Sequence, residues 1–130
     1  KIIITSNVLD SGSTTSSVRI PFNNVGETTS NQYYNCMDMP AAGTVKRFRM
    51  HNTSGSLSTG FTTTMQIYKN GSTTPTSSGS LTAVSGQIEW EPSNYTFSKG
   101  DHLQFAYAKS AGSKYWQGVS ASIIIEFNQV

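Results

Sequence analysis

The feature that most constrains the fold is a two-residue alternation of apolar and polar side chains, broken at short intervals by clusters of Gly, Asn, Ser and Thr. The alternation is cleanest over residues 44–52, 62–69 and 102–109. Because successive side chains of a strand point to opposite faces, this pattern predicts half-buried strands. No segment of useful length has the spacing of an amphipathic helix, so we expect strands and no helices.

These alternating runs predict about nine or ten strands in one domain. We expect them over residues 1–8, 18–22, 32–39, 44–52, 62–69, 81–84, 87–91, 95–97, 102–109 and 120–128, with loops over 11–17 and 72–80. Strands spaced by about a dozen residues are typical of an all-β sandwich or barrel. Since no helical crossover is predicted, the sheets should be antiparallel.

Composition narrows the classes of function. The 130 residues suit one domain, and only 12% of them are charged, with a net charge of +2, which is too weak a basic balance for a nucleic-acid partner. The lone Cys36 excludes an internal disulfide and a zinc site. No apolar run approaches the ~20 residues that would insert into a membrane. The start at Lys1 without Met indicates a fragment, a processed product or the ordered part of a longer chain.

Catalytic constellations are weak. A serine triad would need His51 or His102, yet no Gly-x-Ser-x-Gly elbow occurs, and His102 and its neighbour Asp101 should point to opposite faces of a strand. Residues 99–101 are better interpreted as a tight polar turn in which Gly100 takes a positive φ. Cys36 is expected to be buried and inert.

Two carboxylates, Glu89 and Glu91, should share one strand face, with Trp90 on the other. A spacing of roughly 6.5–7 Å would suit a glycosidase pair, although a solvated acidic face explains the same pattern. Metal-ligand spacings and phosphate-binding loops are absent. The sequence therefore indicates no catalytic residues, no metal and no cofactor.

Two groups are candidates for binding. Alternation places Phe48 and Met50 inward, so that Arg47, Arg49 and His51 line the outer face together with Val45. This basic face could contact an acidic glycan or the acidic side chains of a neighbouring subunit, or it could simply be solvated.

The second candidate is the aromatic pair Tyr115 and Trp116, which lies in a Gly-flanked segment. Exposed aromatic side chains in loops stack on sugars or contact proteins. Alternatively, Trp116 plugs the open end of a sandwich. The sequence leaves both interpretations open.

Three small or apolar residues on nominally outward faces predict a subunit interface. Leu103, Phe105 and Tyr107 should face the core, which leaves Ala106 and Ala108 on a small, uncharged opposite face. In the last strand, Ala121, Ile123, Ile125 and Phe127 should face the core, and Ile124 stands out as apolar on the other side. We expect Ala106, Ala108 and Ile124 to contact another subunit.

The runs GTVKRFRMHN, MQIYKNG, YTFSKGDHLQFAY and SIIIEF resemble compact jelly-roll modules of bacteriophage virion proteins, which are similar in layout to the complement globular-head and tumour-necrosis-factor folds. The likeness covers roughly residues 40–128, and its most specific parts are residues 68–71 and 98–101. It implies an antiparallel β-sandwich of jelly-roll type as a single domain over 1–130, with residues 1–17 as an N-terminal strand or docking arm.

The resemblance also implies a function. Such modules are homotrimers without catalytic activity or cofactor at the virion surface, as capsid decoration proteins, head fibres or tail-fibre tips. The expected partners are other copies of the chain, capsid or fibre subunits, and a host surface glycan in the receptor-binding case. Two rivals remain: a carbohydrate-binding module with Tyr115 and Trp116 as platforms, and a hydrolase that uses Glu89 and Glu91.

Overall fold

The computed structural model describes residues 1–10, 17–22, 35–52, 62–84, 86–110 and 116–128, and for residues 7–10, 117 and 118 it describes the backbone alone. Every regular element in these ranges is a strand, as the alternation predicted. The strands are β1 (Ile2–Asp10), β2 (Val18–Arg19), β3 (Met37–Asp38), β4 (Gly43–Asn52), β5 (Thr62–Lys69), β6 (Ser77–Thr82), β7 (Gln87–Trp90), β8 (Thr96–Phe97), β9 (His102–Lys109) and β10 (Gln117–Phe127).

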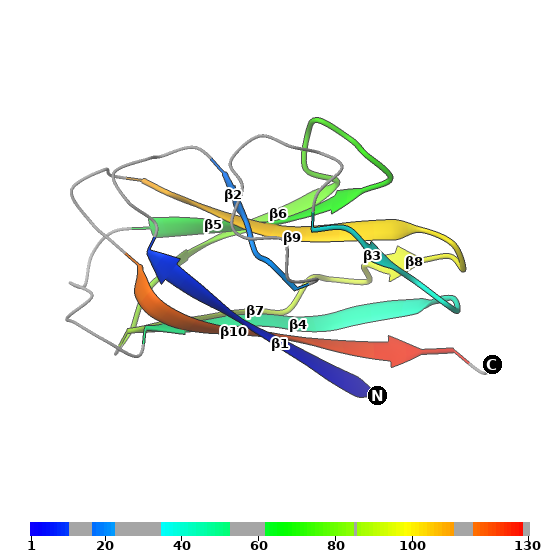
Figure 1. Ribbon diagram of the computed structural model, residues 1–130, viewed down its shortest axis with the longest axis horizontal. Helices are drawn as coiled ribbons and strands as arrows, with labels where there is room; N and C mark the ends of the chain where they lie inside the picture. The colour runs from blue at the N-terminus through cyan, green and yellow to red at the C-terminus, as the bar shows by residue number, and fades with distance from the viewer. Residues whose placement is uncertain (11–16, 23–34, 53–61, 85, 111–115, 129–130) are drawn as a thin grey trace.

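The strands form two antiparallel sheets that pack face to face (Figure 1). Sheet A has the order β1-β10-β4-β7, with β8 also paired to β4, and sheet B has the order β2-β9-β5-β6, with β3 also paired to β9. The pairs β1–β10, β2–β9, β4–β7 and β5–β6 are nested within one another along the chain. This arrangement is one long hairpin rolled into two sheets, so the chain is a β-sandwich of jelly-roll type.

The N-terminal segment forms a strand of the sandwich. All of β1 from Ile2 to Asp10 pairs with β10, with Ile3 opposite Ile124. Within the predicted N-terminal segment 1–17, residues 2–10 therefore form a strand, and residues 11–16 lie outside the described residues. Because Ile2 lies opposite Ile125, the start of β1 and the end of β10 lie side by side at one end of sheet A (Figure 1).

One predicted loop was wrong. Residues 72–80 were expected to be irregular because they are rich in Ser and Thr, but Ser77 begins β6, which pairs with β5 over its whole length. The side chain of Thr64 lies within 2.9 Å of the Ser80 hydroxyl across this pair. A partner strand with free backbone groups has overridden the weak strand preference of Ser and Gly.

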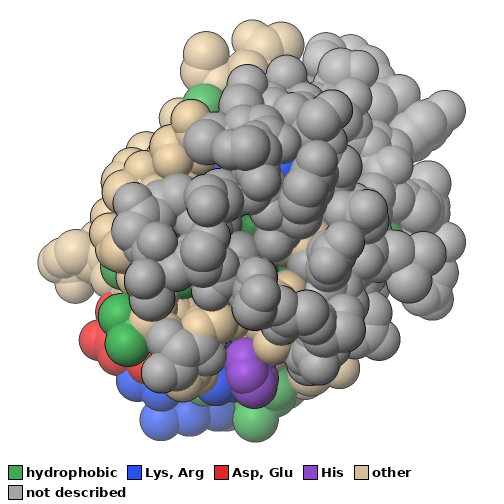
Figure 2. Space-filling view, turned by 90° about the vertical axis from the view of Figure 1, so that its left-hand side faces the viewer, with side chains coloured by type: hydrophobic (Ala, Val, Ile, Leu, Met, Phe, Trp, Pro, Cys, Tyr) green, Lys and Arg blue, Asp and Glu red, His purple; other side chains and the backbone are tan. Residues whose placement is uncertain are grey.

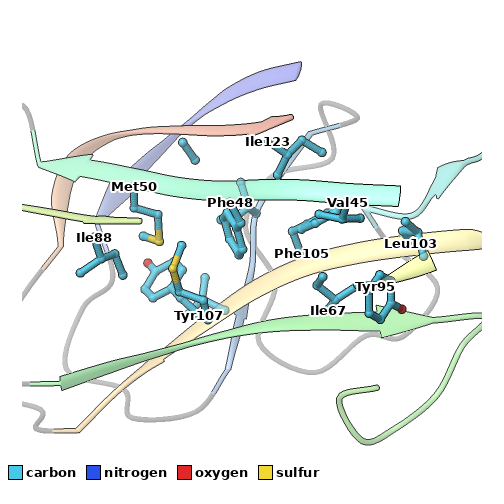
Figure 3. Packing of buried hydrophobic residues seen from close by; sticks show 14 of the residues in the cluster. Val45, Phe48, Met50, Ile67, Ile88, Tyr95, Leu103, Phe105, Tyr107 and Ile123 are labelled. Carbon is cyan, nitrogen blue, oxygen red and sulfur yellow. The ribbon is translucent and has the colours of Figure 1, made fainter. Parts of the chain in front are cut away.

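The core lies between the sheets and is built from alternate residues of β4, β5, β9 and β10 (Figure 3). The rings of Phe48 and Phe105 meet edge to face at 5.4 Å between centroids, one from each sheet. Leu103 and Tyr107 face the core as predicted, as do Ala121, Ile123 and Ile125, while Phe127 packs against it partly buried.

Val45 is also in the core, which corrects its predicted place beside Arg47 on the outer face. The register between β4 and β10 shifts at Ile124 and Ile125: Ile124 lies opposite Arg47, but Ile125 lies opposite Val45. Lys46 is the extra residue of this β-bulge and is exposed. One inserted residue reverses the phase of the alternation, so Val45 and Phe48 both point inward.

Trp116 is fully buried in the core of the sandwich, so it is not the exposed sugar platform that the sequence leaves open. Its indole Nε1 donates a hydrogen bond to the Thr63 hydroxyl at 2.9 Å. A second tryptophan, Trp90, packs so closely over Gly79 that a Cβ atom at this glycine would lie 2.5 Å from the indole nitrogen. Both tryptophans therefore serve packing between the sheets.

Candidate functional site

The outer face of sheet A carries most of the charged groups that the sequence singled out. In Figure 2, Lys and Arg side chains gather at the lower edge of the molecule, with acidic side chains beside them. The groups come from neighbouring strands: Arg47 and Arg49 from β4, and Glu89 from β7, which lies opposite Arg49 in the register. The basic and acidic residues, which the sequence showed as two separate patterns, thus form one surface.

The arginines and glutamates of this surface are paired. Arg47 Nη2 lies 2.6 Å from Glu91 Oε1, and Arg47 Nε lies 3.7 Å from Glu89 Oε1. Arg49 Nε lies 3.9 Å from the same Glu89 oxygen, and its Nη2 donates a hydrogen bond to the Gln87 amide oxygen. The hydrogen bond to Glu91, followed by the charge of Glu89, raises the pKa of Arg47 above its usual value. The pairing leaves little net charge to attract an acidic ligand.

The same pairing bears on Glu89 and Glu91 as a catalytic couple. Each carboxylate already contacts a guanidinium group, and both are open to solvent. A glycosidase couple needs both carboxylates free to act on the glycosidic bond, whereas these two are held in ion pairs with Arg47 and Arg49. The geometry therefore favours a structural ladder of ion pairs over an acid–base pair. His51 lies next along β4, opposite Gln87, and completes the predicted basic face.

An apolar pair lies beside this ladder. Ile124, the outward apolar residue predicted in the last strand, is half-buried and lies opposite Ile3 of β1, which is 69% exposed. A shallow hollow of about 340 Å³ adjoins the pair. Its lining combines both signs of charge around the isoleucine: Lys1, Lys46, Arg47, Glu91, Ile124 and Glu126. Apolar side chains surrounded by charges of both signs are typical of a contact surface.

The outer face of sheet B has a different character. Ala106, predicted at a subunit interface, is fully buried within the chain itself and so is not available to another subunit. Its neighbours across the sheet are Arg19 and Gln66. Ala108 on the same face is half-buried. The structure does not bring Ala108 and Ile124 together, since they lie on opposite outer faces of the sandwich.

Arg19 and Tyr68 are the main residues that the sequence did not reveal on this face. Both are buried, and the guanidinium carbon of Arg19 lies 4.1 Å from the centre of the Tyr68 ring. The Tyr68 hydroxyl donates to Ser17 Oγ at 3.2 Å, and Ser17 in turn donates to Gln66 Oε1 at 2.6 Å. No sequence signal marks this cluster, because its members come from two distant segments, residues 17–19 and residues 66–68.

Residues 98–101 form the predicted turn. Asp101 N–H donates to the Ser98 carbonyl at 3.1 Å, and Gly100 takes a φ of 86°. The Asp101 carboxylate accepts hydrogen bonds from the Asn70 amide at 3.0 Å and from Ser98 N–H at 2.8 Å, and these bonds lower its pKa. Asp101 therefore stabilises a junction between the β5 and β9 ends.

His102 does not pair with Asp101. Its Nε2 lies 3.8 Å from Asp38 Oδ1 on β3, and both side chains are exposed. Cys36 is half-buried, and burial raises the pKa of its thiol, an effect that the nearby Arg19 charge partly offsets. Cys36 is thus less buried than the sequence predicted, and the raised pKa of its thiol makes it a poor nucleophile; its inert role stays a prediction.

The remaining expectations concern Tyr115, a metal site and a membrane-spanning segment. Tyr115 lies outside the described residues. Among the residues that the structure does describe, no three His, Cys, Asp or Glu side chains come together as metal ligands. The described segments also contain no helix that is long and apolar enough to cross a membrane.

Comparison of the chain with protein-family models, with curated proteins and with solved structures gave no match.

Proposed function

We propose that this protein is a non-enzymatic structural module of a bacteriophage virion. In this proposal it forms a homotrimeric jelly roll at the particle surface, as a capsid decoration protein, a head fibre or a fibre tip. Its partners are further copies of the chain and other virion proteins. The proposal joins the resemblance of residues 40–128 to phage jelly rolls with the jelly-roll topology of the chain.

The observation that carries the proposal is the outer face of sheet A. It combines an apolar pair, Ile3 and Ile124, with charges that are already paired on the same surface. Burial of such a face leaves its arginines and glutamates compensated by one another, and Lys46, which forms no salt bridge with the described residues, calls for an acidic group on the other subunit, since an unpaired charge is costly to desolvate.

The position of the candidate interface residues refines the proposed assembly. A closed threefold ring needs two different patches on each subunit, inclined so that the ring closes. Ile124 and Ala108 lie on opposite outer faces, so contacts through both would stack subunits in a line. We therefore assign the trimer contact to the face around Ile124, with its second patch elsewhere on the subunit.

The test is the mass of the protein in solution, measured by sedimentation equilibrium over a wide range of concentrations. The proposal expects a trimer, and Ile124→Arg should shift it toward the monomer. Ser120→Arg is the matched control, because Ser120 is exposed on the same face of β10 and lies farther from the Ile3–Ile124 pair. A monomer at every concentration, or equal effects of the two substitutions, contradicts the proposed trimer.

A host-glycan receptor site is the second candidate function. A hollow of about 370 Å³ near the β6–β7 turn combines planar polar groups with apolar side chains; its lining is Arg49, Leu81, Thr82, Val84, Gln87, Ile88 and Glu89. Because its charges are balanced, it suits a neutral saccharide better than an acidic one. Arg49→Ala should then abolish saccharide binding in calorimetric titrations, while Lys99→Ala leaves it unchanged. Binding that survives Arg49→Ala contradicts this site.

A further inference from the structure

The free edges of the two sheets differ greatly in length. In sheet B, the edge strands β2 and β3 have two residues each and β6 has six; in sheet A, β7 has four and β8 has two. The remaining edge strand, β1, has nine residues, and among the described strands it pairs only with β10. A strand at the edge of a sheet presents a row of backbone donors and acceptors that can pair with another strand.

The devices that usually protect such an edge are missing from β1 between Ile2 and Leu9. Proteins block exposed edges with short strands, charged side chains, prolines or bulges. From Ile2 to Leu9, β1 contains no charged residue and no proline, and its register with β10 is regular through Val8. By contrast, β7 carries Glu89, and Pro21 follows β2 closely.

The apolar exposure of the molecule is concentrated on the same strand. Ile2 is 41% and Ile3 is 69% exposed, and in the described part of the chain Val84 is the one other large hydrophobic residue in this class. Ile3 continues outward from Ile124, its partner on β10, so the two form a short apolar row that ends at the free edge. An uncovered apolar row at an open strand edge is a strong signal for pairing.

The first half of β1 is the half available for pairing. The Ser6 hydroxyl donates a hydrogen bond to the Pro21 carbonyl at 3.0 Å, so the chain after β2 contacts the strand at Ser6. Lys1 to Thr5 precede this contact. Within this stretch the single charge is Lys1 at its start, where the ammonium group lies 4.0 Å from Glu126.

We propose that residues 1–5 of β1 pair antiparallel with the same residues of a second copy of this chain, about a twofold axis that passes beside Ile3. An axis perpendicular to the sheet keeps its two faces on the same sides. Residues that lie opposite each other must therefore belong to the same face, which pairs odd with odd and even with even positions. Centring the joint on the three isoleucines at residues 2–4 places Ile3 opposite Ile3, and the sheet becomes continuous through both copies.

Two properties of the strand favour a second copy over an unrelated strand. First, the antiparallel joint places the two Lys1 residues at its opposite ends, and its middle carries no charge to repel. Second, β10 already holds β1 extended, so pairing two folded copies orders no flexible segment, whereas a free peptide would lose conformational entropy. The joint uses the backbone edge of β1, whereas the proposed trimer uses the outer face around Ile124, which Ile3 adjoins. The joint alone gives a dimer, and together with a closed trimer whose axis meets the twofold axis at a right angle it gives a hexamer.

The first test compares three proteins by sedimentation equilibrium: the unaltered chain, Ile3→Lys and the control Val84→Lys. The control adds the same charge in place of another exposed apolar residue. Val84 lies beside Gln87 of β7, at the edge of sheet A opposite β1. We expect a concentration-dependent doubling of mass that Ile3→Lys weakens about tenfold and Val84→Lys leaves unchanged. Equal masses for the unaltered chain and Ile3→Lys at every concentration would overturn the proposal.

The second test is a disulfide between the two copies. Ile3→Cys in a Cys36→Ser background should form a covalent dimer on mild oxidation, since directly opposite strand residues lie within disulfide reach. Ser78→Cys in the same background is the control, because Ser78 is exposed on β6, the open edge of sheet B. Equal rates for the two variants would overturn the proposed register. A chain that never self-associates but binds a peptide of residues 1–7 would assign the edge to a foreign strand and overturn the second-copy partner.

Because Ile3 and Ile124 are neighbours, the two assemblies must be told apart by stoichiometry. A threefold contact relates each copy to two others and yields masses in multiples of three chains. The twofold joint yields even multiples, and in the Ile3→Cys variant it links the introduced thiols strictly in pairs. A trimer in which Ile3→Cys forms no covalent dimer contradicts the edge pairing alone. A covalent dimer of Ile3→Cys without a trimer contradicts the proposed function alone.

Discussion

The two outer faces of the sandwich have similar alternating sequence patterns, but their side chains differ in exposure to solvent. On sheet A, the outward residues of β4 and β10 remain open, and Arg49 there pairs with Glu89 at the surface. On sheet B, the outward residues Gln104 and Ala106 of β9 are fully buried, next to the buried Arg19. Alternation tells which side chains point away from the core, but it does not tell whether other parts of the chain cover them.

Because of this difference in exposure, substitutions of an arginine or a small residue should have different effects on stability on the two faces. A side chain on the open face can be exchanged for almost any polar one, since water replaces lost contacts. A side chain on the covered face is packed on both sides and behaves as core, although the sequence pattern marks it as outward. The open face is consequently where we place assembly, and the covered face is where substitutions should act on folding.

The largest difference is expected for Ala106→Arg and Ser120→Arg, which add the same side chain to the two faces. Ala106 is fully buried and flanked by Arg19, so a second guanidinium there must be forced into packed space beside a like charge. It should lower the free energy of unfolding by about 3 kcal/mol or more. Ser120 is exposed, and its substitution should change stability by less than about 0.5 kcal/mol.

Chemical denaturation followed by circular dichroism measures both variants. Ala106→Arg should lose the circular-dichroism signal of strands at denaturant concentrations at which the unaltered chain keeps it, while Ser120→Arg stays folded at these concentrations. An Ala106→Arg protein that is as stable as the parent would mean that the covered face of sheet B can open, and it would remove the distinction between the two faces.

The next comparison replaces one arginine on each face by methionine. Arg19 is buried with its guanidinium over Tyr68, so Arg19→Met should cost about 2 kcal/mol through loss of the cation–π contact and of buried polar interactions. Arg49 makes solvent-exposed pairs, and Arg49→Met should change stability by about 0.5 kcal/mol or less. Similar costs in urea denaturation would show that burial does not separate the two arginines.

The strands were predictable where the alternation was long. Thr62–Lys69 and His102–Lys109 have the bounds that the sequence indicated, because each places apolar residues on one face over eight positions. The strand over Ser77–Thr82 was not predictable, since serine and glycine have little strand preference. Its pairing with β5 makes it a strand.

The candidate site was predictable only in part, for three physical reasons. A single extra residue, Lys46, reverses the phase of β4 and moves Val45 into the core, and nothing in the local sequence marks the bulge. Burial of Trp116 depends on a partner 53 positions away, Thr63. The pairing of Arg47 with Glu91 requires β4 and β7 to be neighbours, which follows from topology and not from either strand.

A smaller effect is expected at the margin of sheet B, where Asp101 joins the ends of β5 and β9. Its pKa is lowered by hydrogen bonds from Asn70 and Ser98, so the ionised carboxylate stabilises the fold at pH values above its unfolded pKa. This contribution should disappear as the pH falls from about 4 through the lowered pKa. Asp101→Asn should therefore reduce the melting temperature at pH 7 and leave it unchanged near pH 2; a constant difference across this range would contradict the role of ionised Asp101.

The smallest effect is expected on the open face, where Glu89→Gln removes the carboxylate that Arg47 and Arg49 share. Exposed ion pairs gain little because water solvates the separated charges almost as well, so the free energy of unfolding should fall by about 0.5 kcal/mol or less. The loss should shrink further in 1 M salt, where charges are screened within about 3 Å. Gln also keeps the shape of Glu, so a large, salt-independent loss would mean that this face is covered after all. Loss of a polysaccharide-cleaving activity in the same variant would instead support Glu89 as a catalytic group.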